Sequence, residues 1–269
     1  MRISVVIPAC DEEGNIGALV EETFASVPDA VLGEVIVVDD GSADGTANEI
    51  RALLPRYSKL RLLRHGERSG QSAALRTAIL AAGCPLIATM DGDGQNDPRD
   101  IEKMVARMAP PGSDGPALVG GIRSERKASS SRRWASSSAN WIRDRALKDD
   151  CPDTGCGIKV YWREAYLRLP YFTSMHRYMP ALFLSYGQRV DYVPVNDRPR
   201  RAGVSKYSNL GRALVGLYDL FGVIWLRRRT HIPRIAEDSG TEDRVSELAD
   251  KAQDRRGGAT RKTGSRSVR

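Results

Sequence analysis

The sequence is poor in three features that mark many specialised proteins: paired cysteines, histidines and long apolar runs. Its four cysteines form no C-x-x-C pair, and its three histidines do not accompany them at metal-site spacing. This pattern argues against a zinc site and indicates reduced thiols. No run reaches the roughly 18 apolar residues of a membrane-spanning helix. The nearest, from Ala213 to Leu226, contains Asp219, so we expect no ordinary transmembrane helix.

The N-terminus lacks the charged, apolar and small-residue zones of a secretion signal, because "MRISVVIPAC" begins at once with a strand-like run. We therefore expect a cytoplasmic protein. With 41% hydrophobic and 28% charged residues over 269 positions, the composition is that of a globular chain. Its length fits one large domain, or one domain with an appendage.

Acidic residues are outnumbered by basic ones, which gives a net charge of +7. This charge fits an anionic partner such as nucleic acid, an acidic membrane surface or a phosphorylated substrate, and it also fits simple solubility. Aromatic residues are only 6% and do not interleave with the basic clusters as on a base-stacking surface. We expect no nucleic-acid partner, although a basic nucleic-acid or membrane-binding module is the non-enzyme alternative. The missing G-x-G-x-x-G after the first strand-like run disfavours a dinucleotide-binding oxidoreductase.

Short β-branched runs alternate with helix-like segments over the first 108 residues. This alternation predicts an α/β fold with a mainly parallel, open sheet and helices on both faces. The runs "VIVV" and "PLIATM" are apolar throughout, so their strands belong in the middle of the sheet. The expected strands are "ISVVIP", "EVIVVDD", "LRLLR" and "PLIATMD", and the expected helices cover residues 15–25, 43–54, 71–82 and 99–108.

Beyond Ala109 the pattern weakens. The turn-rich "PPGSDGP" and the basic, serine-rich "SERKASSSRRWASSSANW" indicate a connector and a solvated loop. Strands resume with "GIKVYW" and "RVDYVPV", on either side of a helical "ALFLSYG". From about Ile235 the chain is charged and almost without aromatics, which predicts disorder. The predicted division is a main domain over 1–210, an amphipathic helix over 211–230 and a disordered tail over 236–269.

Two acidic pairs follow predicted strands: Asp39 and Asp40 in "VVDDGS", and Asp91 and Asp93 in "MDGDGQ". Ligands of open parallel sheets bind beyond the carboxyl ends of the strands, so both pairs fall at the expected binding edge. The D-G-D spacing lets two carboxylates converge on a hard cation, with Gln95 as a further oxygen ligand. Such a cation would bridge diphosphate oxygens and stabilise a leaving group. The alternative for D-G-D alone is a plain Asp-Gly turn.

Six motifs extend this pattern along the chain. In order they are "SVVIPACDEEGNI", "VIVVDDGSADGT", "GQSAALRTAI", "MDGDGQNDP", "DTGCGIKVYWR" and "RAGVSKY". Residues 2–230 thereby resemble family 2 glycosyltransferases of the GT-A (Rossmann-like) fold, above all the dolichol-phosphate mannosyltransferase-like branch, which loads a sugar onto a polyprenyl phosphate. The resemblance implies an inverting hexosyltransferase that takes a GDP- or UDP-linked sugar and uses Mg²⁺ or Mn²⁺. The alternative within the family is transfer to a saccharide or protein hydroxyl.

The resemblance also implies roles for particular residues. Those implied to hold the nucleoside diphosphate are Pro8, Glu12, Asp39, Asp40, Gly70, Gln71 and Asp91. Within this set Asp39 would contact the base, and Gly70 with Gln71 would close over the nucleotide. The residues implied to hold the metal are Asp91, Asp93 and Gln95, the two aspartates also counting as catalytic. Many relatives carry an aromatic residue and asparagine where this chain has Cys10 and Asp11, so we do not expect aromatic stacking on the base there.

An acceptor that is already a phosphate dianion needs cationic groups more than a general base. The residues implied to gather the acceptor and donor phosphates are Arg123, Arg132, Ser136, Arg200 and Lys206, with Arg133 and Arg198 as neighbouring alternatives. Solubilising surface charge is the other interpretation of each arginine. Asp153 in "CPDTGCG" is interpreted as lining the site, and the three histidines as surface or packing residues.

The segment from Gly211 to Arg229 has apolar residues on one face and arginines at both ends. The apolar residues are Leu214, Leu217, Phe221, Ile224 and Trp225, and the flanking arginines are Arg212 and Arg227 to Arg229. This pattern fits a helix at a membrane surface or a helix that packs on the core. A lipid acceptor favours the first interpretation, hence a peripheral position at the inner face of the cell membrane. The sequence indicates neither the sugar nor an oligomeric state.

Overall fold

The computed structural model describes residues 1–123, 147, 149–199 and 209–232, with side chains of the last segment described from Gly216 onward. The chain divides into two units, Met1–Thr230 and His231–Arg269, and all elements named below belong to the first. The serine-rich stretch and the predicted tail lie outside the described residues.

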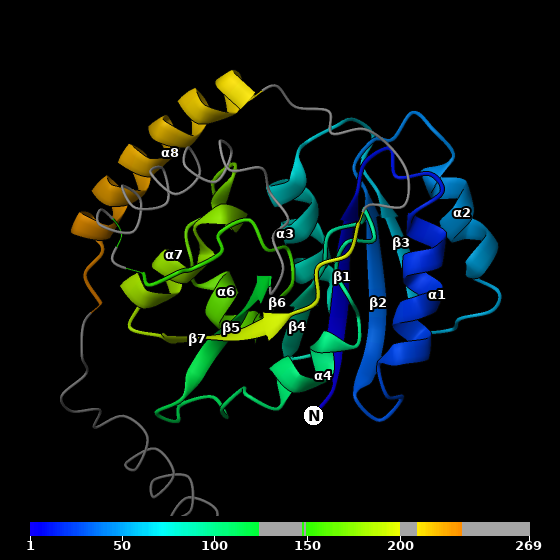
Figure 1. The fold of residues 1–269 in the computed structure, drawn as a ribbon, viewed down its shortest axis with the longest axis horizontal. Helices are drawn as coiled ribbons and strands as arrows, with labels where there is room; N and C mark the ends of the chain where they lie inside the picture. The colour runs from blue at the N-terminus through cyan, green and yellow to red at the C-terminus, as the bar shows by residue number, and fades with distance from the viewer. Residues whose placement is uncertain (124–146, 148, 200–208, 233–269) are drawn as a thin grey trace, which may run out of the picture. The chain divides into compact units, whose positions relative to one another are not determined.

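The described residues form a seven-stranded sheet in the order β3-β2-β1-β4-β6-β5-β7 (Figure 1). Its strands are β1 (Ile3–Ala9), β2 (Leu32–Asp39), β3 (Leu60–Arg64), β4 (Leu86–Thr89), β5 (Pro116–Arg123), β6 (Lys159–Trp162) and β7 (Arg189–Val195). Neighbours β3-β2-β1-β4 are parallel, as are β5 and β7, whereas β6 runs antiparallel to both β4 and β5. The prediction of a mainly parallel sheet is confirmed.

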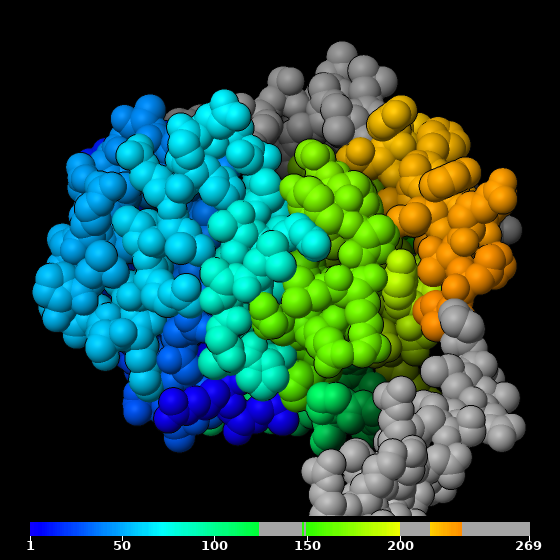
Figure 2. All heavy atoms as spheres, turned by 180° about the vertical axis from the view of Figure 1, so that it is seen from behind, coloured from blue at the N-terminus to red at the C-terminus, as the bar shows by residue number. Residues whose placement is uncertain are grey.

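Helices cover both faces of this sheet. They are α1 (Ile16–Ser26), α2 (Thr46–Leu53), α3 (Gln71–Ala81), α4 (Asp100–Val105), α6 (Arg163–Leu167), α7 (Met179–Ser185) and α8 (Asn209–Arg229), with a 3₁₀ turn, η1 (Met175–Arg177). The helices α1 and α2 pack together on the face seen in Figure 1. On the opposite face, seen from behind in Figure 2, α3 lies beside the segment from α6 to α7. This arrangement confirms the predicted α/β fold.

The central strands are buried on both sides, which explains their continuous apolar sequence. Every residue of β1 is buried, including Ser4 and Pro8. The strand β4 is likewise buried throughout. Because covered parallel strands expose neither face to water, both sets of alternating side chains are mostly apolar. The placement of "PLIATM" in the middle of the sheet is therefore correct.

The strand β5 is not predicted by the sequence pattern, because "PALVGGIR" contains two glycines and follows a turn-rich connector. It is stabilised by pairing on both sides, with β6 and with β7. A Cβ added at Gly121 would lie 2.8 Å from Ile158 Cγ2 and 2.9 Å from Cys156 Sγ. Glycine at this position therefore lets β5 lie close to the turn that enters β6.

The helix α8 has a packed face and an exposed face. Val223 is 1% exposed, and Leu220 and Ile224 pack against the core. We call the exposed residues Leu217, Tyr218, Phe221 and Trp225 the outer stripe; each of them is more than half exposed. The predicted amphipathic helix is confirmed, but Ile224 lies on the packed face, and the side chains of Arg212 and Leu214 are not described. No helix in the described part of the chain is both long and apolar enough to span a membrane.

Candidate active site

One edge of the sheet collects the ends of several strands. Because β1, β2 and β4 are parallel, their carboxyl ends meet there, as the pairing of Ala9 with Asp39 shows. The antiparallel β6 starts at this edge, since Lys159 pairs with Thr89 at the end of β4. Both acidic pairs of the sequence follow strands that end at this edge, so the predicted location of the site is supported by the topology.

The carboxylate of Asp91 is enclosed by its neighbours. Its Oδ1 accepts a hydrogen bond of 2.8 Å from Gln71 Nε2 at the start of α3. A Cβ added at Gly157 would lie 2.2 Å from Asp91 Oδ2, so no larger residue fits there without moving the carboxylate. Burial, followed by the negative charge of Asp93, raises the pKa of Asp91 to about 6. The two carboxylates are thus close enough to repel each other.

The loop that carries Asp93 is tied to the end of β7. Asp93 Oδ1 accepts a hydrogen bond of 3.1 Å from the backbone N–H of Gln95. Gln95 Nε2 donates to the carbonyl of Arg198 at 3.2 Å, and the N–H of Arg198 donates back to the Gln95 carbonyl at 3.0 Å. Gly94 has a φ of 74°, a conformation that glycine adopts without strain. The loop conformation therefore depends on both its own turn and a distant strand.

Asp91, Asp93 and Gln95 fit a magnesium or manganese ion. The described residues contain no group of three or more His, Cys, Asp or Glu side chains that would hold a metal by themselves. Magnesium typically binds through one or two carboxylates together with substrate phosphates, so two carboxylates suffice. Asp91 and Asp93 repel each other, and a divalent cation bound between them would neutralise this repulsion.

We expect the affinity for Mn²⁺ to fall by about tenfold per pH unit below pH 6, because the metal binds the ionised carboxylate and must displace the proton of Asp91. Above pH 6 that proton is already lost, so the affinity should level off. Mn²⁺ binding followed by electron paramagnetic resonance between pH 4.5 and 7.5 measures this. Asp91→Asn is the control and should bind weakly at every pH. A pH-independent affinity in the wild type would contradict the assignment.

The two carboxylates at the carboxyl end of β2 are engaged within the protein. Asp39 is fully buried and accepts hydrogen bonds from the Ser42 N–H at 2.9 Å and from Arg64 Nε at 2.8 Å. Asp40 accepts from the N–H groups of Ser69 at 2.9 Å and Gly70 at 2.7 Å. Both oxygens of Asp39 are engaged and its side chain is 0% exposed, so a base N–H would reach it only after a local rearrangement. Its predicted contact with the base stays a prediction.

Asp40 connects the carboxyl end of β2 to the loop that carries Asp91 and Asp93, which we call the acidic loop. By holding Gly70, whose φ is 92°, it fixes the start of α3, where Gln71 bonds Asp91. Its Oδ1 also lies 2.7 Å from His65 Nδ1. The structure thus brings Asp40, Gly70, Gln71 and Asp91 into one hydrogen-bonded chain.

The loop after β1 explains how the chain accommodates Asp11 where many relatives carry asparagine. This residue has a φ of 50°, a conformation in which aspartate is enriched among non-glycine residues, and its Oδ1 accepts the N–H of Ala43 at 2.8 Å. Glu12 is held by the Thr46 hydroxyl, which accepts its N–H at 2.8 Å. Pro8 lies in β1, where its carbonyl would be 2.9 Å from a Cβ at Gly92. Pro8 and Glu12 therefore lie on either side of this turn.

Arg123, at the end of β5, forms a bidentate ion pair with Asp153. The distances are 2.6 Å from Nε to Oδ2 and 2.7 Å from Nη2 to Oδ1. This pairing raises the pKa of the Arg123 guanidinium above its ordinary value. The structure places both residues at the carboxyl-end edge of the sheet, where Nε and Nη2 of Arg123 already donate to Asp153. The other predicted phosphate-binding residues, Arg132, Arg133, Ser136, Arg200 and Lys206, lie outside the described residues.

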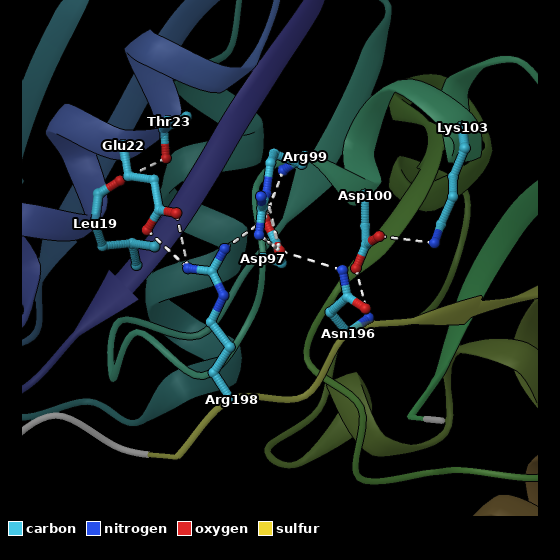
Figure 3. A network of polar contacts seen from close by, with 9 residues as sticks. All are labelled: Leu19, Glu22, Thr23, Asp97, Arg99, Asp100, Lys103, Asn196 and Arg198. Carbon is cyan, nitrogen blue, oxygen red and sulfur yellow. Dashed lines mark hydrogen bonds and ion pairs between the residues drawn. The ribbon is translucent and has the colours of Figure 1, made fainter. Parts of the chain in front are cut away.

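Arg198 lies between two carboxylates (Figure 3). Its guanidinium contacts Glu22 on α1 at 2.8 Å and Asp97 before α4 at 2.6 Å. Hydrogen bonds from Arg99 and Arg198 hold the pKa of Asp97 well below its usual range, against the effect of its burial. Asn196 joins the same network through Asp97 at 3.2 Å. Arg198 thus fastens the chain after β7 to α1 and to the acidic loop, which differs from the phosphate contact considered for it.

We expect Arg198→Ala to destabilise the fold by about 3 kcal/mol, because it leaves the buried Asp97 and the half-buried Glu22 without this partner. Thermal melting measures the loss. Arg99→Ala is the matched control: Arg99 pairs with the same carboxylate, but its side chain is 66% exposed, so its loss should lower the melting temperature much less. Equal effects of the two variants would show that the network of Arg198 contributes nothing beyond its single contact with Asp97.

A cavity of about 170 Å³ lies beside Asp91, and of its lining residues the sequence analysis assigned only Gln71 and Asp91 to the site. Its polar lining residues include Gln71, Asp91, Lys159, His176 and Arg177. His176 Nδ1 pairs with the Ser72 hydroxyl at 2.7 Å. Burial, followed by the positive charges of Arg177 and Lys159, lowers the pKa of His176 to about 3, so its imidazole is neutral at pH 7. Lys159 is the one charged residue in the apolar strand sequence "GIKVYW". A lysine in such a strand indicates a buried cation, which the sequence analysis did not consider.

Comparison with known proteins identifies the family. The glycosyl transferase family 2 model matches residues 4–169. The chain is 34% identical over 232 residues to the dodecaprenyl-phosphate galacturonate synthase of Rhizobium johnstonii, covering 85% of this chain and 68% of the relative. It is 32% identical over 222 residues to the undecaprenyl-phosphate 4-deoxy-4-formamido-L-arabinose transferase of Pseudomonas aeruginosa, covering 81% and 63% respectively. The chain thus spans about two thirds of the length of these relatives.

Among solved structures, the glucosyl-3-phosphoglycerate synthase of Mycobacterium tuberculosis in complex with Mn²⁺ and UDP is similar, with a TM-score of 0.63. The match covers 88% of this chain and 81% of the other, at 20% identity. This likeness shows the GT-A fold. The family model over residues 4–169 and the 34% identical relative establish that the chain belongs to glycosyl transferase family 2.

Proposed function

We propose that this glycosyltransferase moves a sugar from a nucleoside diphosphate to a polyprenyl phosphate, with inversion at the anomeric carbon. The observation that carries the proposal is the hydrogen-bonded chain from Asp40 through Gly70 and Gln71 to Asp91. It joins the strand end where the nucleoside is expected to the carboxylate expected to hold the metal. The relatives named above, which act on dodecaprenyl and undecaprenyl phosphates, support the acceptor class.

The residues on the donor side have separate roles in holding the metal and the nucleotide. Asp91 and Asp93, with Gln95, would hold Mg²⁺ or Mn²⁺, which when bound neutralises the diphosphate and stabilises it as a leaving group. Asp39 accepts an N–H of the base, while Pro8 and Glu12 lie beside the nucleoside. Gln71 orients the Asp91 carboxylate by its hydrogen bond. Because a phosphate acceptor arrives ionised, no side chain need remove a proton from it.

The acceptor side carries the positive charge. Arg123 lies at the edge of the sheet, and we assign Arg132, Ser136, Arg200 and Lys206 to the same phosphate-binding group. The outer stripe of α8 supplies a membrane contact, with Arg228 and Arg229, both exposed, facing anionic headgroups. We therefore place the enzyme at the inner face of the cell membrane, where a lipid phosphate is within reach.

The test is a transfer assay with matched acceptors. The protein with Mn²⁺ is incubated with UDP- and GDP-linked sugars and either undecaprenyl phosphate, a free monosaccharide or a peptide hydroxyl acceptor. The proposal predicts a polyprenyl-phosphate sugar as the product and no glycoside of the hydroxyl acceptors. Transfer to hydroxyls, with no reaction of the lipid phosphate, would favour the alternative activity within the family. The sugars named for the two relatives differ, so the donor has to be established separately.

A further inference from the structure

The cavity beside Asp91 contains a buried cation that the metal site does not use. Lys159, the first residue of β6, is 7% exposed. In the described part of the chain its ammonium donates to the Cys156 carbonyl and forms no ion pair with a carboxylate within 4.0 Å. Lysine is almost never fully buried unless it is paired, and its ammonium has three donors. Its charge acts on the nearby Asp91 carboxylate, and two donors of the ammonium remain for an anionic group of a ligand.

The other groups around the cavity also favour an anion. Arg177 adds a second positive charge to the lining, and His176 presents a neutral ring whose Nδ1 is occupied by Ser72. The acidic residue on the wall, Asp91, belongs to the proposed metal site and is bonded by Gln71. The remaining balance of charge in the cavity is positive, which matches a ligand carrying a negative group.

The size and place of the cavity indicate a sugar. Its volume of about 170 Å³ is close to the roughly 150 Å³ of a cavity that takes up one benzene-sized ring. A polyprenyl chain is far larger than this space. Since Asp91 forms part of both the cavity wall and the proposed metal site, a sugar on a metal-bound diphosphate lies next to the cavity. Lys159 and Thr89 are paired across β6 and β4, so the backbone that carries the ammonium belongs to the sheet.

We propose that Lys159 makes the enzyme selective for a hexuronic acid by pairing with the carboxylate at C6 of the donor sugar. The inference rests on the proposed function, nucleotide-sugar transfer, and specifies its sugar class. A neutral hexose would leave Asp91 as the acidic neighbour of the buried ammonium and would not form this charge-assisted hydrogen bond. The discrimination therefore acts between donors that differ only in carboxylate and hydroxymethyl groups.

Matched donor pairs test this selectivity. The pairs are UDP-galacturonate with UDP-galactose, UDP-glucuronate with UDP-glucose, and GDP-mannuronate with GDP-mannose, each assayed with undecaprenyl phosphate and Mn²⁺. The wild type should prefer the uronate of its pair. Lys159→Met, which keeps the length of the side chain and removes the charge, should lower kcat/KM for the uronate by about 100-fold, the range of a hydrogen bond to a charged group. It should change kcat/KM for the neutral donor by less than about threefold.

Two further variants separate selectivity from a structural role. Lys159→Arg keeps the charge and should retain part of the uronate preference, whereas Arg189→Met, which removes an exposed arginine at the far end of β7, should leave it unchanged. A wild type that prefers the neutral donor would overturn the inference whether or not the Lys159 variants fold. An equal loss for both donors in Lys159→Met would also overturn it, since that result shows a structural role.

The failure of the proposed function would be recognised separately. Equilibrium binding of each donor pair with Mn²⁺, measured by calorimetry without an acceptor, reports the sugar preference alone. A uronate preference that disappears in Lys159→Met, in a protein that does not glycosylate the lipid phosphate, would support the role of Lys159 and reject the acceptor. Equal binding of both donors would reject the role of Lys159 even if the lipid phosphate is glycosylated.

Discussion

Asp93→Asn is expected to lower sugar transfer by at least about 1000-fold, because the substitution removes one of two charges from the metal site, and metal stabilisation of a leaving group is worth several kcal/mol. The fold should be unaffected. One contact of Asp93 in its loop is an acceptor bond from the Gln95 N–H, which the amide oxygen of asparagine preserves. Transfer rates at saturating donor, beside thermal melting, measure the two effects.

A control carboxylate distinguishes a specific loss of metal from a general change of charge. Asp114 is 86% exposed and pairs with Arg189 away from the site. Asp114→Asn should therefore transfer sugar at the wild-type rate. Mn²⁺ binding by Asp93→Asn should weaken together with the activity. Near-normal transfer by Asp93→Asn at saturating Mn²⁺ would remove Asp93 from the metal site.

Replacing Phe221 and Trp225 by serine is expected to reduce binding to anionic vesicles by about 100-fold. The side chains of Phe221 and Trp225 are 66% and 62% exposed. Moving the apolar surface of each from water into the acyl boundary therefore contributes about 1.5 kcal/mol to the free energy of binding. The melting temperature should hardly change, because neither side chain packs on the core. Co-sedimentation with anionic and neutral liposomes, run beside melting curves, measures both quantities.

Two controls define the role of the outer stripe. Leu80→Ser removes an apolar residue that is 54% exposed on α3, outside α8, and should leave vesicle binding intact. Val223→Ser, on the packed face of α8, should lower the melting temperature while the folded protein still binds vesicles. Binding should weaken as the salt concentration rises, because Arg228 and Arg229 act on the headgroups through screened charges. A wild type that stays in the supernatant at low salt would exclude a membrane role for α8.

The family and the acidic loop were predictable because they depend on local sequence. Continuous apolar runs identify buried parallel strands, and parallel strands bring their carboxyl ends to one edge. Asp39 ends one such strand and Asp91 follows another, so their shared edge is predicted by the pattern. The strand β5 escaped prediction because Gly121 is required by its close approach to Cys156 and Ile158, and this contact exists only in the assembled sheet.

The tertiary structure alone decided what several polar residues do. Arg198 suits a phosphate by its sequence neighbours, yet it pairs with Glu22, 176 positions away. His176 contacts Ser72 across 104 positions, and the cavity that both sides enclose leaves no periodic pattern in the sequence. Lys159 becomes a buried cation beside Asp91 only because β6 pairs antiparallel with β4. The sequence by itself determined which residues follow the strands. Which charges meet was decided by the chain's long-range packing, since the partners of a buried charge are set by distance in space.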